Sequence, residues 1–117
     1  MRSAQSTLAV DVRPEGATVH VRLDGELDIT SSPLLQTVVD QVLAARREPL
    51  CRRLVVDMSG VGFADASGIS PLLLARAVLA RRNGHVELRH CRRGVRRLIR
   101  LLGVEDMVEA DTAQGID

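Results

Sequence analysis

The sequence predicts an α/β domain built on a mixed sheet of four to five strands, with the helices mainly on one face. The chain begins with an alternating β-hairpin, continues with two further runs of strand length, and separates these with segments of helical period. Strands joined through helices over short connections run parallel by right-handed crossovers, whereas a hairpin is antiparallel. The hairpin alternation leaves one polar side in water, so we expect the helices to cover the other side.

The hairpin is predicted from alternation on both sides of the stretch PEGA, in which Pro14 and Gly16 are turn residues. Its apolar positions are Leu8, Val10, Val12, Val19, Val21 and Leu23. This period of two indicates two strands that share one buried face.

A helix and a buried strand follow the hairpin. Ser32 is a suitable N-cap, and Pro33 suits the first turn of a helix that runs to about Arg46. The stretch RRLVVDMS is β-branched and lacks alternation, which is typical of a central strand. We expect this strand to close at Asp57.

A second helix is predicted next, but Pro71 leaves its start open. Proline has no N–H group and clashes with the carbonyl four residues back, so the helix begins near Ser67 or later, or at Pro71 itself with Ser70 as the cap. The helix ends at the sequence NG. The remaining pattern predicts a strand over HVELRH, a third helix that stops at Gly103, and an edge strand or a tail over VEDMVEAD.

The composition fits one cytoplasmic domain over residues 1–117, with a core at about 8–110, a short polar N-terminus and an acidic C-terminal tail. The 117 residues suffice for one hydrophobic core, and 45% of them are hydrophobic. No apolar run approaches the roughly 18 residues of a membrane span. The N-terminus lacks the apolar core of a signal peptide. We therefore expect no membrane insertion.

The sequence contains no recognisable catalytic or metal-binding constellation. Its three histidines have neither metal-ligand spacing nor a serine–histidine–aspartate arrangement. The chain has no lysine, which argues against receiver-type chemistry at Asp57 and against a phosphate-binding P-loop. We expect a protein that is not an enzyme and needs no cofactor.

Charge is unevenly distributed, although the net charge is only +1. Residues 76–100 carry nine arginines and one acidic residue, Glu87, whereas residues 101–117 carry five acids and no base. We interpret the basic segment as an exposed helix face, with binding to an acidic protein as the alternative. Direct nucleic-acid binding is not expected, because the segment has no aromatic side chain for base stacking.

Three segments resemble the STAS domain family. LDGELDITSSPLL is similar to a strand and helix start of the family, LVVDMSGVGFADASGIS to its central strand and signature loop, and RRLIRLLGVEDMVE to its closing helix. The resemblance covers about residues 8–110 and implies a STAS-like fold. Chains of this size look most like bacterial anti-sigma factor antagonists, which bind an anti-sigma factor of the serine-kinase type and so release a sigma factor. In that family, phosphorylation of the serine after the loop aspartate switches binding off.

The resemblance implies a partner-binding edge formed by Asp28, Asp65, Ser67, Gly68 and Ile69, with the exposed face of the second helix beside it. Asp65 either orients the partner or is a solvated helix cap. The alternative function is a STAS subunit of a larger assembly, a stress-sensing scaffold or a transporter accessory, without a phospho-switch. The sequence does not predict the oligomeric state.

The phosphoacceptor position of the family is occupied here by Ala66, which has no hydroxyl. Three interpretations remain. Ser67 is the acceptor, or the domain binds without a phospho-switch, or another hydroxyl such as Ser70 or Ser59 is modified. In structural terms we expect Ser67 to be the N-cap of the second helix.

The two cysteines are predicted to remain thiols. Cys51 precedes the central strand and Cys91 follows the HVELRH strand, so in neighbouring parallel strands they lie at opposite ends of the sheet. Five or six residues of strand span roughly 17–20 Å. A disulfide needs Cα atoms within about 7 Å.

Overall fold

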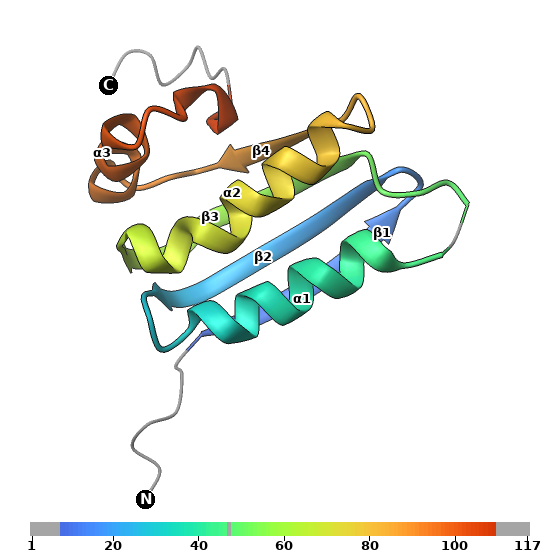
Figure 1. Ribbon diagram of the computed structural model, residues 1–117. Helices are drawn as coiled ribbons and strands as arrows, with labels where there is room; N and C mark the ends of the chain where they lie inside the picture. Colours follow the sequence, from blue (N-terminus) through green and yellow to red (C-terminus); the bar gives the residue numbers. More distant parts are fainter. Residues whose placement is uncertain (1–7, 47, 110–117) are drawn as a thin grey trace, which may run out of the picture.

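The computed structural model describes residues 8–46 and 48–109, which form a four-stranded sheet with three α-helices (Figure 1). In chain order the elements are β1 (Ala9–Glu15), β2 (Thr18–Leu27), α1 (Ser32–Ala44), β3 (Arg53–Ala64), α2 (Ala66–Ala80), β4 (His85–Arg89), α3 (Arg93–Leu101) and a 3₁₀ helix (Glu105–Met107). The strand order is β1-β2-β3-β4, with β1 antiparallel to β2 and the other neighbours parallel. The predicted mixed sheet is confirmed.

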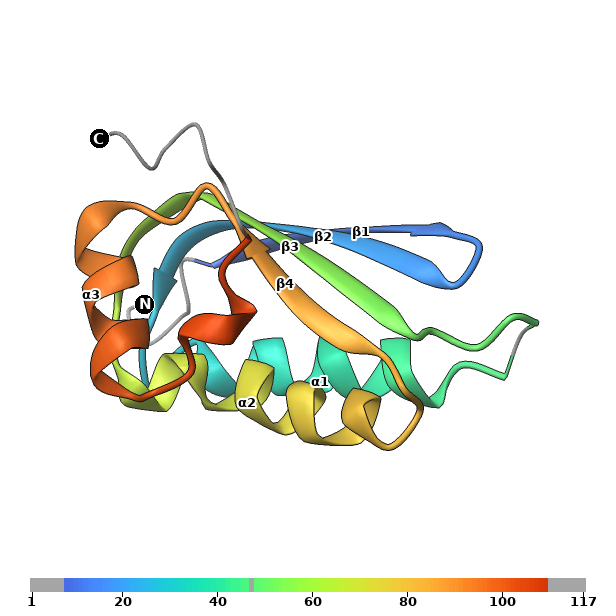
Figure 2. The ribbon, with the colours of Figure 1, turned by 90° about the horizontal axis from the view of Figure 1, so that it is seen from above.

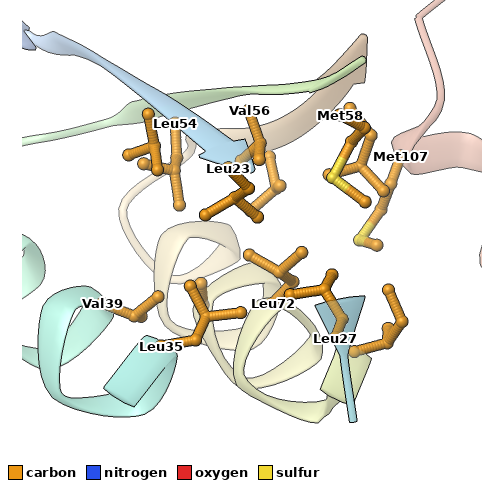
Figure 3. Packing of buried hydrophobic residues seen from close by; sticks show 14 of the residues in the cluster. Leu23, Leu27, Leu35, Val39, Leu54, Val56, Met58, Leu72 and Met107 are labelled. Carbon is orange, nitrogen blue, oxygen red and sulfur yellow. The ribbon is translucent and has the colours of Figure 1, made fainter. Parts of the chain in front are cut away.

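Helices α1 and α2 lie side by side on one face of the sheet, as expected, and the core fills the space between the two layers (Figure 2). Figure 3 shows the packing of strand side chains against helix side chains, with Leu23, Leu54 and Val56 facing Leu35 and Leu72. All five are at most 1% exposed. Apolar residues at a period of two on the strands and at helical spacing on α1 therefore meet in one core.

The opposite face of the sheet carries charges of alternating sign. In the register of the sheet, Asp11, Arg22, Asp57 and Arg89 form one row across the four strands. The Arg22 Nη1 and Asp57 Oδ2 atoms lie 3.4 Å apart. Cross-strand pairs of opposite charge stabilise a sheet by about 0.2–1 kcal/mol each. This row of charged side chains explains why the outer face of the sheet remains exposed to water.

Strand β3 is longer than predicted, and Asp57 does not close it. The strand continues to Ala64, and α3 packs against this extension. Gly60 permits the extension to pair closely with β2, because a Cβ atom there would overlap the side chain of Asp24 and the carbonyl of Leu23. The prediction was wrong because the sequence SGVGF lacks a strand period and becomes a strand only by pairing with the end of β2.

The stretch VEDMVEAD forms neither an edge strand nor a tail in its described part, residues 104–109. It makes the 3₁₀ turn and then a single parallel bridge between Val108 and Leu88 of β4. The N–H of Glu109 donates to the carbonyl of Leu88 at 3.0 Å. Met107 is only 1% exposed, so this turn closes the core beside β4.

The predicted placement of the cysteines agrees with the sheet. Strands β3 and β4 are parallel neighbours, and Cys51 precedes the first whereas Cys91 follows the second. Both thiols are buried. The Cys51 Sγ donates to the carbonyl of Arg53 at 3.6 Å.

Candidate functional site

The loop after β2 is held together by its own side chains. Oδ1 of Asp28 accepts from the backbone N–H of Thr30 at 3.0 Å, from the Thr30 hydroxyl at 2.7 Å and from the N–H of Ser31 at 3.1 Å. The Thr30 hydroxyl is the main cause of a lowered pKa for the Asp28 carboxyl. Ser31 is buried and donates its hydroxyl to the carbonyl of Glu26 at 2.7 Å. The Asp28 carboxylate therefore stabilises the conformation of this loop.

Helix α1 begins one residue earlier than predicted. Its first residue is Ser32, so the N-cap position belongs to Ser31 and the prediction of Ser32 as cap was wrong. The Ser31 side chain does not cap the helix, because its hydroxyl is used within the β2–α1 loop. The helix ends at Ala44, two residues before the predicted end.

The N-cap of α2 is Asp65. Its backbone is extended (φ −129°), and its Oδ1 accepts from the N–H of Gly68 at 3.0 Å. Ser67 is the second helical residue, so the prediction of Ser67 as the cap was wrong, and the interpretation of Asp65 as a capping aspartate is confirmed. An aspartate at this position satisfies one of the N–H groups that the first turn leaves without a partner.

Pro71 lies inside α2, which starts at Ala66 and so five residues before the proline. Proline has no N–H to donate to the carbonyl of Ser67, four residues back. That carbonyl accepts instead from the hydroxyl of Ser70 at 2.9 Å. Ser70 therefore compensates for the proline within the helix, and a helix that starts at Pro71 with Ser70 as its cap is excluded.

The two loops meet at one edge of the sheet, where β2 and β3 end and α1 and α2 begin (Figure 1). The N–H of Asp65 donates to the carbonyl of Leu27 at 2.9 Å. Gly68 lies directly against the same carbonyl, because a Cβ atom on it would overlap Leu27 and approach the N atom of Asp28. Backbone contact thus joins the segments GELD and DASG, which are about 40 residues apart in the chain.

The predicted site residues differ in exposure. Ser67 is exposed, and Asp28 and Asp65 are half-buried. Gly68 is buried, and Ile69 is 0% exposed and belongs to the hydrophobic core. Gly68 and Ile69 therefore position the loop from beneath, and the partner-binding edge of Asp28, Asp65, Ser67, Gly68 and Ile69 remains a prediction.

Comparison with known proteins agrees with this geometry. The sequence model of the family described as "Mlab, STAS domain" matches residues 10–109. The chain belongs to the STAS domain family.

Three anti-sigma factor antagonists are similar to this STAS domain. The anti-sigma F factor antagonist of Paenibacillus polymyxa is 24% identical over 97 residues, which is 83% of this chain and 80% of the relative. An anti-sigma factor antagonist from Mycobacterium paratuberculosis has a similar structure, with a TM-score of 0.75, 21% identity, and coverage of 94% of this chain and 92% of that one. The unphosphorylated form of the antagonist SpoIIAA has a TM-score of 0.74, 20% identity, and coverage of 93% and 94%. At these identities the structural likeness concerns the fold.

Exposed apolar side chains beside the loops of the STAS domain were missed from the sequence. Ile29, next to Asp28, is 71% exposed, and Phe63, at the end of β3, is 50% exposed. Phe63 pairs with Glu26 in the β2–β3 register, which places it beside the first loop. Exposed apolar side chains mark a protein interface where they gather in one patch. One signal was available, since Phe63 is the only aromatic residue of the chain and lies two positions before Asp65.

The three candidate hydroxyls have different surroundings. The Ser70 hydroxyl donates to the carbonyl of Ser67 within α2, and Ser59 is half-buried, with its backbone N–H donating to the carboxylate of Asp57 at 2.9 Å. The Ser67 hydroxyl is exposed and makes no hydrogen bond to any of the described residues. Ala66 is exposed beside it. Ser67 is thus the most accessible of the three.

Within residues 8–46 and 48–109, no group of three or more His, Cys, Asp or Glu side chains is arranged to hold a metal ion. None of the described helices is both long and apolar enough to cross a bilayer.

Proposed function

We propose that this STAS domain is an anti-sigma factor antagonist. It binds a serine-kinase anti-sigma factor in the cytoplasm through the edge formed by the Asp28 and Asp65 loops, and so releases a sigma factor. It acts by binding alone, without catalysis, cofactor or nucleic acid. The relatives named as anti-sigma factor antagonists support this function.

The observation that carries the proposal is the backbone junction between the two loops. It holds half-buried Asp28 and Asp65 beside exposed Ser67, with exposed Ile29 and Phe63 at the same edge. A protein interface needs apolar contact area surrounded by polar groups that set orientation. This edge offers both on elements that are fixed by the sheet and by the cap of α2.

Ser67 is the proposed phosphoacceptor. It is the second residue of α2, where a phosphate would lie near the N–H groups of the first turn and the positive end of the helix dipole, so the domain tolerates it. The same dianion would be buried against the partner beside Asp65, where repulsion and desolvation oppose binding. Phosphorylation would therefore release the anti-sigma factor without unfolding the domain.

The test is calorimetric titration of the kinase-type anti-sigma factors of the same cell with three forms of the chain. We expect the unmodified chain to bind and Ser67→Ala to bind similarly. Phosphorylated chain, or Ser67→Glu, should bind at least about tenfold more weakly, which corresponds to about 1.4 kcal/mol. Mass spectrometry after incubation with the kinase and ATP should place the phosphate on Ser67.

Gln41→Glu is the matched control, because it adds one negative charge at an exposed position of α1, nine residues beyond the start of that helix. It should bind like the unmodified chain. Equal weakening in both variants, or phosphate on Ser59 or Ser70 with Ser67 unmodified, would contradict the proposed switch. Absence of binding to any such factor would contradict the proposed partner.

A second candidate function is that of a STAS subunit in a larger assembly, without a phospho-switch. One observation favours it: Ala66 has no hydroxyl at the position where the family places its acceptor. Affinity purification of the chain from its own cell, followed by mass spectrometry, separates the two. Subunits of a transport or stress-sensing complex would support the second function, and a kinase-like anti-sigma factor the first.

A further inference from the structure

Helix α3 has an outward face made of arginines. Val95 and Ile99 are buried and attach the helix to the sheet and to the 3₁₀ turn. The face turned away from them carries Arg93, Arg96, Arg97 and Arg100, at the i, i+3, i+4 and i+7 positions that align on one side of a helix. We call these four residues the α3 basic face. In Figure 2, α3 stands at one end of the molecule, beyond the layer formed by α1 and α2.

Most of these arginines have no carboxylate partner within the described residues. The side chains of Arg93 and Arg97 make neither an ion pair nor a hydrogen bond there, and the side chain of Arg96 donates only to the carbonyl of Cys91, at 3.5 Å. Arg100 has an exposed contact of 3.6 Å with Glu105. Elsewhere, carboxylates lie at ion-pair distance from Arg13, Arg22, Arg53, Arg76 and Arg89. Other described arginines, such as Arg52 and Arg82, also lack a carboxylate and donate to backbone carbonyls instead, but α3 brings three arginines without a carboxylate partner together on one helix.

The α3 basic face is also hollowed. Its four arginines and Cys91 line a depression of about 680 Å³. The Nε of Arg96 is buried there and has no hydrogen-bond partner among the described residues. A buried donor without a partner is unfavourable, so the Arg96 side chain gains where it turns outward to an acceptor. Cys91 contributes apolar wall rather than chemistry, because burial raises the pKa of its thiol to about 11.

We propose that the α3 basic face is a binding site for a carboxylate-rich segment of a partner protein. The planar guanidinium fork of arginine matches a carboxylate with two parallel hydrogen bonds. Four such groups in a helical array fit a partner helix or extended strand that carries several Asp or Glu residues. The site shares no residue with the edge proposed for the anti-sigma factor, so it adds a second contact surface to that function.

The surroundings favour an acidic protein segment over a nucleic acid or a membrane. Helix α3 has nine residues, which is about 13 Å of helix, and Glu105 and Asp106 limit the basic surface at its far end. No aromatic residue lies on it to stack bases. Among the described residues, Leu101, 76% exposed, is the one strongly exposed large apolar side chain at the edge of this face, and a single side chain is too little to insert into lipid.

The test uses fluorescence anisotropy with a labelled helical peptide that carries glutamates at i, i+3, i+4 and i+7, and the same peptide with glutamines. We expect saturable binding of the glutamate peptide alone, which weakens as NaCl rises from about 0.05 to 0.5 M. The double variant Arg93→Glu/Arg97→Glu should raise Kd at least about tenfold. Both side chains are exposed, and circular dichroism should show an unchanged fold.

The matched control is Arg46→Glu/Arg81→Glu, which makes the same change in net charge at exposed positions outside α3. It should leave Kd unchanged, as should Ser67→Glu, which tests the other surface. Equal loss in both double variants would overturn the site, since only net charge would then matter. Tighter binding of single-stranded DNA or of phosphatidylglycerol vesicles than of the peptide, lost in the α3 variant, would overturn the assignment to a protein segment.

Discussion

Replacement of Gly68 by alanine should separate the two loops that form the proposed site. Gly68 lies one residue after Ser67 in the first turn of α2, and its Cα faces the end of β2. A Cβ atom there would overlap the carbonyl group of Leu27. Because the obstacle is backbone inside the sheet rather than a flexible side chain, α2 must move away from β2. That movement also strains the hydrogen bond from the N–H of Asp65 to the same carbonyl.

The expected loss of stability is the difference between two terms. Overpacking a close contact costs about 1–3 kcal/mol, and a backbone obstacle belongs at the upper end of that range. Alanine in a helix recovers up to about 1 kcal/mol relative to glycine. The net destabilisation should be about 2 kcal/mol, which lowers the midpoint of urea unfolding by about 1 M for a domain of this size.

Gly94→Ala is the matched control, because Gly94 is also in the first turn of its helix and nothing lies within 4 Å of a Cβ atom placed on it. Urea unfolding followed by circular dichroism should give Gly94→Ala a midpoint equal to or above that of the unmodified chain, and Gly68→Ala a clearly lower one. A Gly68→Ala variant as stable as the unmodified chain would refute the close approach of α2 to β2.

Two further predictions concern titration and thiols. The Thr30 hydroxyl lowers the pKa of the Asp28 carboxyl from its ordinary 3.8. The stabilisation by the ionised carboxylate is therefore present above that value and is lost as pH falls through the lower native pKa. Urea midpoints should decrease below about pH 4, and should decrease less steeply with pH in Asp28→Asn. An equally steep decrease in both forms would contradict this. Burial raises the pKa of Cys91 to about 11, so the folded chain should react slowly with a thiol reagent at about pH 8, and Cys51 and Cys91 should both react after denaturation. Rapid reaction in the native state would contradict the burial of the thiols, and no reaction after denaturation would contradict the prediction that both cysteines are free.

The strand and helix pattern was predictable because it depends on local periodicity. Alternation in the hairpin and helical spacing after Pro33 each identify the side that faces the core, whatever the core contains. The extension of β3 was not predictable in this way. Its sequence, with glycines at 60 and 62, has weak strand propensity and becomes a strand through pairing with β2 and cover from α3.

The same distinction between local pattern and tertiary packing applies to the site residues. The motif around Asp65 located the loop, and its hydroxyls were visible as candidates. The roles of these hydroxyls depend on where α2 starts. The sequence left that start open, because Pro71 favours a helix that begins later than the motif indicates. The structure resolves the conflict with the Ser70 hydroxyl, which bonds the carbonyl that Pro71 leaves without a donor, so that Asp65 becomes the cap and Ser67 is exposed.

By itself, the sequence determined the order of strands and helices, the buried faces and the family, since these follow from the spacing of side chains along the chain. Only the tertiary structure decided which loop residues are exposed. Gly68 and Ile69 are interior because α2 packs against the carbonyl of Leu27, while Ile29 and Phe63 are left in water. The exposure of a loop side chain depends on how distant segments pack, so a local sequence pattern does not predict it.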